Sequence, residues 1–499
     1  MHRPASPFLH LALFVVFACM ALALPACTTI GGATLGPTLQ KQSLELVRQL
    51  EESGMILDDA ALADYVSAIG SRLVEKTSAA TDRPYHFAVL DAAEPNAFAL
   101  PTGHIYISRG LLVLMASEDE LAGVLGHEIG HVVEQHSLKQ STGQLAFAPI
   151  RLVTWIGGSI TGLVLPRVGG AITASGELPA ALTGATYSRK QENEADEVGQ
   201  DLAARAGWDP SALSLVMDAL ARAVSLQGQD PNASSWFSSH PTSPDRAAKI
   251  RSRAADLVAG PANPIAPSAR AFLARLDGLV VGESAKGGVF DGPEFLHPVL
   301  GFSVRLPAGD EWVRVNTEQA VVALRESPRA AVVLEVVAEG DDPMEVARAF
   351  EPSTGKLDGA PKSETVNGLP TAYAAGGVSG GWGRPAIRAS VRWIAHDGFV
   401  YRIVGQSTEE DQAALADEFD AAERSFRALT SDDRDRIRES RLRIETAKSG
   451  EDLAKLLERV GSDWPLPEAA AANAVDANSP LAAGQPVKVT RRERFEPDS

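Results

Sequence analysis

The chain has 499 residues, and its 64 aspartates and glutamates outnumber its 46 lysines and arginines, which gives a formal net charge of −18. Hydrophobic residues make up 45% of it, so the composition excludes a disordered chain and a collagen-like repeat. A nucleic-acid-binding protein carries a basic patch, and the acidic balance argues against that class of partner. At about 100–200 residues per domain, the length predicts two to four domains.

Residues 1–26 are typical of a signal peptide and do not belong to the predicted fold. A short cationic start, His2-Arg3, precedes an almost unbroken apolar run over residues 8–24. The run is short for a membrane-spanning helix, which needs about 20 apolar residues. We therefore expect cleavage after this segment.

The sequence Leu24-Pro25-Ala26-Cys27 resembles the lipobox of bacterial lipoproteins, in which the cysteine becomes the acylated first residue. The resemblance implies lipidation at Cys27, and the alternative is ordinary secretory cleavage without a lipid. Cys19 lies in the discarded run, so the mature chain has one cysteine and no intramolecular disulfide. Because Thr28, not an aspartate, follows Cys27, the resemblance implies a lipid anchor in the outer membrane with the body of the protein in the periplasm.

The pattern of apolar residues predicts a multidomain α+β protein that begins with a mostly helical domain over residues 37–256. Strand-like stretches at residues 84–90 and 105–107 predict a small sheet within it. Its helices are predicted in residues 37–77 (two helices), 117–135, 188–206 and 210–226.

An apolar, glycine-rich insert interrupts this domain at residues 145–182. Gly157-Gly158 and Pro166 break it, which favours a partly buried loop with short helices over a membrane-spanning segment. A lid over the site, or a segment that dips into a membrane, is the alternative. Prolines at positions 261, 264 and 267 mark a linker, predicted over residues 257–287.

Beyond the linker, alternating strands and hairpins predict a separate α+β domain over residues 288–430. The Asp397-Gly398 pair is typical of a two-residue hairpin turn. No metal-ligand or nucleophile pattern occurs in this domain, and we interpret its His297 and His396 as structural.

The C-terminal part starts with a charged connector, residues 431–443, and ends in a tail, residues 491–499. Between them, residues 444–490 have a strand, two helices and a strand in order. This β-α-α-β pattern resembles a LysM-type glycan-binding module, and the resemblance implies peptidoglycan as a partner. An unrelated small cap is the alternative.

His127-Glu128-Ile129-Gly130-His131 is an H-E-x-x-H pattern, which indicates a zinc site on a helix. Residues four apart share one helical face, so both imidazoles can point at one Zn²⁺ ion. Glu128 lies beside the first ligand and reaches the water that the metal carries. A structural zinc site has no use for such a carboxylate, so the pattern favours an enzyme. Gly126 and Gly130 allow a neighbouring backbone to come close.

A catalytic zinc site usually takes three protein ligands, and two histidines leave it short of one. Glu192 and Asp196 lie four residues apart at the start of the helix over residues 188–206, so they face the same way. Glu194 points about 200° around that helix from Glu192. Only one of the two glutamates can reach the metal, and spacing alone does not choose between them.

Three groups of residues together resemble the CAAX prenyl endopeptidase-like gluzincins, particularly their HtpX-like bacterial relatives of the periplasm and of outer-membrane quality control. The resemblance covers about residues 37–251. The groups are the H-E-x-x-H pattern, then Ser188-Arg189 with Glu192-x-Glu194-Ala195-Asp196, and then His240-Pro241 with Arg246. Upstream, Asn96-Ala97-Phe98-Ala99 and Gly103-x-Ile105-Tyr106-Ile107 match as well.

The resemblance implies that the mostly helical domain is a zincin-like metallopeptidase domain with one zinc ion per chain. It makes Glu192 the third zinc ligand and Asp196 the carboxylate that holds a ligand imidazole, for which a solvated helix charge is the alternative. It gives Glu194 no metal role.

The resemblance also implies where the substrate binds. The strand that contains Asn96, Ala97 and Phe98 becomes the edge on which an extended peptide lies. Arg246 is placed with the substrate-binding residues. His104 and His136 match no motif, and we interpret both as structural.

His240 has two possible roles under this resemblance. It can donate a hydrogen bond to the oxyanion of the scissile carbonyl, or it can be a fourth zinc ligand that replaces the catalytic water at rest. A surface histidine is the third possibility. We favour the latch, because the apolar insert and the long polar loop before His240 are typical of a site closed at rest.

The sequence therefore predicts a zinc-dependent endopeptidase of the bacterial cell envelope that cleaves misfolded or misassembled envelope proteins. In this mechanism Glu128 is the general base toward a water whose pKa zinc lowers to about 7. The alternative is a non-catalytic lipoprotein adaptor with a structural zinc site, which binds peptidoglycan or assembly factors. Hydrolysis of a small or glycan substrate is a third hypothesis.

Overall fold

The computed structural model describes most of the chain in two compact units, which are treated separately below. The described residues are 36–77, 84–136, 187–226, 236, 240, 245–317, 320–350, 356–379 and 385–496. The first unit contains the described residues up to 282 together with 440–492, and the second contains 283–439 with 493–496. Three predictions lie outside the described residues: the signal peptide, the lipid at Cys27 and the insert at 145–182.

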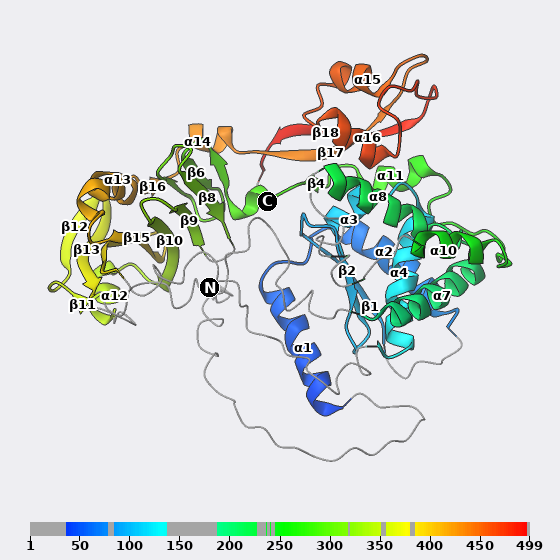
Figure 1. Ribbon diagram of the computed structural model, residues 1–499, viewed down its shortest axis with the longest axis horizontal. Helices are drawn as coiled ribbons and strands as arrows, with labels where there is room; N and C mark the ends of the chain where they lie inside the picture. Colours follow the sequence, from blue (N-terminus) through cyan, green and yellow to red (C-terminus); the bar gives the residue numbers. More distant parts are fainter. Residues whose placement is uncertain are drawn as a thin grey trace, which may run out of the picture. The chain divides into compact units, whose positions relative to one another are not determined.

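The first unit is mostly helical, as predicted (Figure 1). A small sheet has the strand order β1-β3-β2, in which β1 (His86–Leu90) runs parallel to β3 (His104–Ser108). Strand β2 (Ala97–Ala99) pairs antiparallel with β3 and lies at the edge of the sheet. The helices are α1 (Pro37–Glu52), α2 (Ala60–Val74), α3 (Arg109–Leu114), α4 (Glu118–Val133), α7 (Arg189–Ala206), α8 (Leu213–Leu226), α10 (Arg246–Ala254) and α11 (Ala269–Leu276).

Helix α4 carries the H-E-x-x-H pattern, and its first turn is held by buried contacts. The Ser117 hydroxyl accepts the backbone N–H of Glu120 and caps the helix. The buried carboxylate of Glu118 accepts hydrogen bonds from the Tyr65 hydroxyl at 2.7 Å and from Trp208 Nε1 at 2.8 Å. A carboxylate in the first turn also suits the positive end of the helix dipole. These contacts fix α4 against α2 and the end of α7.

Glycines let α4 and α7 pack backbone against backbone. A Cβ placed on Gly199 of α7 would lie 2.7 Å from the backbone nitrogen of His127. A Cβ on Gly130 of α4 would lie 2.7 Å from the carbonyl oxygen of Ala195. Both separations are far below a van der Waals contact, so any larger side chain would push the helices apart. Helices α4 and α7 therefore meet as closely as their backbones allow.

The stretch predicted as a linker over residues 257–287 belongs in part to the core of the first unit. Helix α11 lies within it, and Phe272, Leu273 and Leu276 are buried in the same core as α2 and α4. The backbone N–H of Ile265 donates to Glu118 at 2.8 Å. The linker prediction was wrong here because the prolines precede a short helix with an apolar face, which the core takes up.

The C-terminal part has the predicted β-α-α-β order. It consists of β17 (Arg438–Thr446), α15 (Leu453–Val460), α16 (Leu466–Asn473) and β18 (Pro486–Arg494), and β17 lies between β18 and β4 (Val280–Val281) in the sheet. Residues 440–492 nevertheless pack with the first unit. The buried Lys488 donates from Nζ to the carbonyl oxygens of Val113 and Met115, at 2.8 and 2.9 Å. This region therefore docks on the chain just before α4.

The second unit is rich in strands. Its main sheet has the order β11-β13-β14-β15-β10-β9-β8, with β12 paired to β13, and a smaller sheet has the order β16-β7-β6-β5. The predicted turn at Asp397-Gly398 joins β14 to β15, and both residues have positive φ, at 47° and 80°. The strands are β5 (Val289–Asp291), β6 (Glu294–His297), β7 (Phe302–Arg305), β8 (Trp312–Asn316), β9 (Ala320–Arg325), β10 (Ala330–Glu339), β11 (Lys356–Leu357), β12 (Lys362–Val366), β13 (Leu369–Val378), β14 (Ile387–His396), β15 (Phe399–Thr408) and β16 (Arg427–Ala428).

The helices of this unit are α12 (Pro343–Ala349), α13 (Gln412–Arg424) and α14 (Ser431–Arg436), besides the 3-10 helix η4 (Ala285–Gly287). The predicted connector over residues 431–443 thus forms α14 and most of β17. The two histidines interpreted as structural contact the backbone of this unit: His297 Nδ1 accepts the N–H of Leu300, and His396 Nε2 lies 3.0 Å from the Gly301 carbonyl oxygen.

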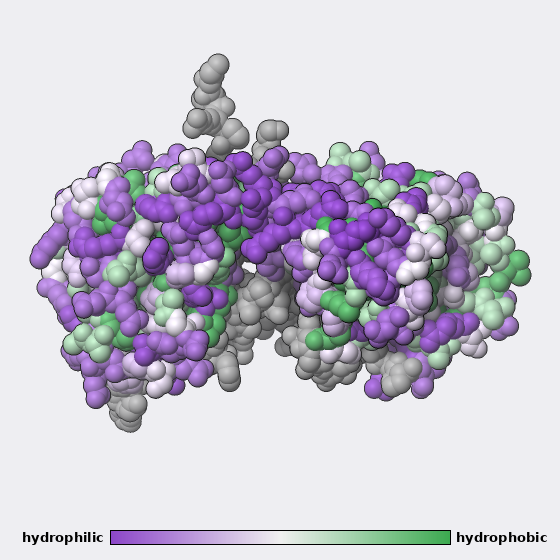
Figure 2. All heavy atoms as spheres, turned by 90° about the horizontal axis from the view of Figure 1, so that it is seen from above, coloured by the Kyte–Doolittle hydropathy of each residue, from purple (hydrophilic) through white to green (hydrophobic). Residues whose placement is uncertain are grey.

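Large hydrophobic residues on the described surface are scattered. The exposed ones, such as Leu44, Leu215 and Val299, come from different elements. In the view of Figure 2, hydrophobic residues stand among hydrophilic ones. Within the described ranges, no helix combines the length and the apolar character needed to cross a membrane.

The contact between α4 and α7 is tested by Gly199→Ala. The added methyl group meets backbone atoms that cannot rotate away, so we expect the free energy of unfolding of the first unit to fall by about 1–3 kcal/mol. Chemical denaturation of the full chain measures this. The control is Glu197→Ala, on the exposed side of the same helix. Equal stability of both variants would show that the helices separate without cost.

Candidate metal centre

Four buried side chains bring metal-binding atoms together in the first unit: His127 and His131 from α4, Glu192 from α7, and His240. The Nε2 atoms of the two α4 histidines are 3.0 Å apart. Glu192 Oε1 lies 3.3 Å from His131 Nε2 and 3.1 Å from His240 Nδ1, which is itself 3.2 Å from His127 Nε2.

These separations match those of four ligands around one zinc ion. A tetrahedron with bonds of 2.0–2.1 Å has edges of about 3.3 Å, which is close to the distances between the donor atoms. Imidazole nitrogens and a carboxylate oxygen are also the ligands that zinc takes in proteins. The residues present therefore fit a zinc ion by geometry and by chemistry.

Local structure orients the ligands. The i, i+4 spacing places both α4 histidines on one helical face. At the start of α7, Ser188 and Gln191 form a capping box that fixes the first turn, in which Glu192 lies. The ring of Tyr187 stacks on His131 with a centroid distance of 3.8 Å and an angle of 22°. The rings and the carboxylate are thus restrained before a metal binds.

Glu128 is fully buried beside this group, and its two carboxylate oxygens have no hydrogen-bond partner among the described residues. His240 lies beside it, with its Nε2 atom 3.6 Å from Glu128 Oε1. Burial raises the pKa of Glu128 above its ordinary value. Burying an unpartnered carboxylate costs stability, so packing does not explain its position. A proton acceptor that faces a metal site does explain it.

Asp196 contacts the His127 ring through the nitrogen that faces away from the other donor atoms. Its Oδ1 lies 2.9 Å from His127 Nδ1, on the side of the ring away from the group of donors. Burial alone would raise the pKa of Asp196, but the charge and hydrogen bonds of Arg246 lower it below its ordinary value. The aspartate is therefore an anion that accepts the N–H of the imidazole, which is the position expected from the sequence.

Arg246 bridges the two acidic residues of α7. Its guanidinium donates to Asp196 through Nε and Nη2, each at 2.7 Å, and its Nη1 lies 2.5 Å from Glu192 Oε2. We predicted a role in substrate binding for Arg246. The structure instead places its buried guanidinium against these carboxylates, because a planar fork pairs best with carboxylate groups. It neutralises charge and orients Glu192.

A second group lies next to the first and was missed by the sequence reasoning. His136, just past the end of α4, has its Nδ1 atom 2.9 Å from His131 Nδ1. Its Nε2 atom lies 3.1 Å from Glu194 Oε2. These two residues and Glu134 bring metal-binding atoms within 4.8 Å of one another. The feature of the sequence that could have indicated this second group is the position of Glu194, two residues after Glu192.

The predicted substrate strand has the expected edge position. Ala97 and Phe98 lie on β2, and the Phe98 ring stacks on Tyr106. Asn96 precedes them, and its backbone N–H donates to Ser108 Oγ at 2.8 Å. Its buried side-chain amide has no hydrogen-bond partner within the described part of the chain. His104, interpreted as structural, lies on the neighbouring strand β3 with its Nδ1 atom 2.9 Å from the Thr102 hydroxyl.

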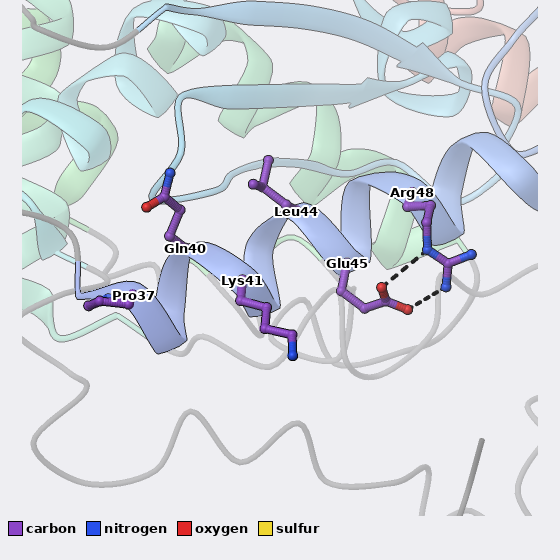
Figure 3. A pocket seen from close by; sticks show the side chains of 6 residues that line it. All are labelled: Pro37, Gln40, Lys41, Leu44, Glu45 and Arg48. Atoms are coloured by element: carbon purple, nitrogen blue, oxygen red, sulfur yellow. Dashed lines mark hydrogen bonds and ion pairs between the residues drawn. The ribbon is translucent and has the colours of Figure 1, made fainter.

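A surface pocket on α1 is separate from this centre (Figure 3). Its lining includes Leu44 and the ion pair between Glu45 and Arg48. It shares no residue with the group of metal-binding side chains. We therefore assign it no part in the chemistry.

Metal analysis of the purified protein tests the ligand set. We expect one zinc per chain, because the donor atoms surround a single position. His127→Ala and Glu192→Ala should lose the zinc, since each removes a ligand, whereas the exposed Glu197→Ala should keep it. Full zinc content in Glu192→Ala would overturn the assignment of the third ligand.

The chain also resembles known proteins in this region. Residues 60–254 match Peptidase family M48. The chain is 30% identical over 240 residues to the beta-barrel assembly-enhancing protease of Escherichia coli (strain K12). The aligned residues cover 48% of this chain and 48% of that protein. It is 32% identical over 171 residues to metalloprotease LoiP of the same organism, 34% of this chain and 63% of that one.

A third relative is the mitochondrial metalloendopeptidase OMA1 of Schizosaccharomyces pombe, at 32% identity over 190 residues, which covers 37% of this chain and 51% of that one. The chain thus spans about half the length of the assembly-enhancing protease and of OMA1. The matched range contains His127, His131 and Glu192, together with Glu128 and His240. Residues 60–254 of this chain are therefore a domain of peptidase family M48.

Proposed function

We propose that the chain is a zinc-dependent endopeptidase of the bacterial cell envelope. The observation that carries this proposal is the buried carboxylate of Glu128. It has no hydrogen-bond partner among the described residues and lies beside four donors at zinc-ligand separations. The family M48 domain supports the same class of reaction. We assign His127, His131 and Glu192 as the zinc ligands of the active enzyme.

A zinc ion held by these ligands would lower the pKa of a water to about 7 and polarise the peptide carbonyl. Glu128 takes the proton of the attacking water on its carboxylate and passes it to the leaving amine. Asp196 accepts the Nδ1–H of His127 and holds that ring in the tautomer with a free Nε2. Arg246 keeps the carboxylates of Glu192 and Asp196 in place.

The edge strand β2 supports an extended peptide as the substrate. On its outer side β2 pairs with no strand of the described residues, so this edge can pair with a peptide backbone by β-augmentation. The side-chain amide of Asn96 offers a donor and an acceptor that no described residue uses. A polypeptide that presents an extended segment would fit this edge, and a folded domain would not.

We further propose that the substrates are misfolded or misassembled envelope proteins. One relative is named for enhancing β-barrel assembly, and this supports a substrate from the outer membrane. The lipobox resemblance at Cys27 supports an anchor in that membrane, with the domain in the periplasm. Residues 444–490 would add contact with peptidoglycan if their resemblance to LysM reflects their role.

The second candidate function, a non-catalytic adaptor, is favoured by one observation. Four protein donors close the coordination sphere, as in a structural zinc site. Against it, a structural site would give the carboxylate of Glu128 no role, although burying such a group without a hydrogen bond costs stability. A site that closes at rest and opens for substrate accounts for both observations.

Glu128→Gln tests the enzyme hypothesis. The amide keeps the shape of the side chain and removes the proton acceptor, so we expect normal zinc content and no cleavage of unfolded casein. The matched control is Glu197→Gln, an exposed glutamate of α7 that should cleave like the unmodified protein. Casein cleavage by Glu128→Gln at the normal rate would reject the proposed endopeptidase and favour the non-catalytic adaptor.

His240 fits the role of a latch. Its Nδ1 atom lies among the other three donors, where it takes the position that water needs in a catalytic zinc site. As an oxyanion donor it would have to point at a substrate carbonyl instead. The latch requires His240 to leave the metal when a substrate binds.

His240→Ala separates the two roles. Loss of a latch should raise the basal rate of casein cleavage, because the fourth position becomes open to water. Loss of an oxyanion donor should lower turnover by about 10²–10³ with zinc retained. The control is His86→Ala, an exposed histidine of β1. A lower rate with full zinc content would therefore decide against the latch.

A further inference from the structure

We propose that His136 and Glu194 form a hydrogen-bond relay that positions the zinc ligand His131 and sets its tautomer. The inference rests on the proposed zinc function, because it concerns the ring that binds the metal. It gives a role to a histidine and a glutamate that the H-E-x-x-H and Glu192 pattern left unused.

The chain is shaped to bring His136 back to its neighbour. Helix α4 ends at Val133, and Gln135 has a positive φ of 53°, which turns the backbone sharply. The His136 side chain is then fully buried, with its Nδ1 atom 2.9 Å from His131 Nδ1. The side chain of Gln191, in the first turn of α7, donates to the carbonyl oxygen of His136. Both helices thus hold this residue in place.

The direction of the relay follows from the metal site. The Nε2 atom of His131 faces the other donors, so it must carry a lone pair for zinc and the proton must be on Nδ1. That Nδ1–H points at His136 Nδ1, which accepts it with its own lone pair. The proton of His136 is then on Nε2 and is donated to Glu194 Oε2 at 3.1 Å. Each imidazole thus has one defined tautomer.

Both histidine ligands of α4 are therefore tied to a carboxylate of α7. His127 reaches Asp196 directly, whereas His131 reaches Glu194 through the ring of His136. The two carboxylates differ in exposure, because the Asp196 side chain is 6% exposed and that of Glu194 is 34% exposed. A ligand imidazole normally donates its second N–H to such an acceptor, and losing the acceptor weakens metal binding.

The same residues can be interpreted as a second metal site, since Glu134, His136 and Glu194 offer donor atoms within 4.8 Å. The two interpretations exclude each other. A metal on His136 Nε2 would need the lone pair there and would move the proton to Nδ1, where it would face the Nδ1–H of His131. Two N–H groups would then point at each other across 2.9 Å. The zinc site therefore favours the relay.

The first test measures zinc affinity of the full chain by competition with a chromophoric chelator. His136→Ala should bind zinc about 10–100-fold more weakly, because His131 loses its acceptor. His136→Asn should recover most of that loss, since its Oδ1 can stand where Nδ1 stood. Glu134→Gln is the control and should bind zinc normally. Normal affinity in His136→Ala would overturn the relay, and apo-protein unfolding curves show whether each variant is folded.

The second test reads the tautomers directly by ¹⁵N NMR of the zinc-loaded chain with labelled histidine. His136 should carry its proton on Nε2, and Glu194→Ala should shift that signal. A proton on His136 Nδ1, or a second zinc that Glu134→Gln removes, would overturn the relay and support a metal at His136. Failure of the proposed function looks different, because the unmodified protein would then bind no zinc.

Discussion

The contact between the backbones of α4 and α7 is the constraint on which the metal centre depends. Gly199 and Gly130 bring the helices together without side chains between them. At this separation the carboxylate of Glu192, in the first turn of α7, reaches the face of α4 that carries His127 and His131. The first turns at Glu118 and at Ser188 then fix where each helix starts, and so which residues face the contact.

Most of the charged side chains buried in the site are paired with a group of opposite charge or with a hydrogen-bond donor, and Glu128 is the exception in its hydrogen bonding. Arg246 offsets the charge of Glu192 and Asp196, and hydrogen bonds to the imidazoles use their remaining oxygens. Neither carboxylate oxygen of Glu128 has a hydrogen-bond partner among the described residues, and His240 Nε2 lies 3.6 Å from Oε1. Buried, unpartnered groups are costly, and functional sites are where such costs persist. The hydrogen bonding thus distinguishes Glu128, which we propose moves a proton, from Asp196 and Arg246, which hold the proposed zinc ligands in place.

Local signals in the sequence predicted the elements that carry the site, because the i, i+4 spacing on α4 and the strand-like stretches that became β1 and β3 depend on near neighbours. The choice between Glu192 and Glu194 could not be made from spacing, since it depends on how two helices pack. Contacts distant in the sequence were also missed: α11 in the core, and Lys488 against the chain before α4. The relay through His136 needs a sharp turn after a helix, which no local pattern indicated.

X-ray absorption spectroscopy of the zinc-loaded full chain tests the account most directly, because it reports the atoms around the metal. The account predicts four nitrogen and oxygen ligands at about 2.0–2.1 Å, with the multiple scattering of three imidazoles. In His240→Ala one imidazole should be replaced by an oxygen at an unchanged coordination number. Six oxygen ligands, or a site with fewer than two imidazoles, would contradict a zinc centre built by α4 and α7.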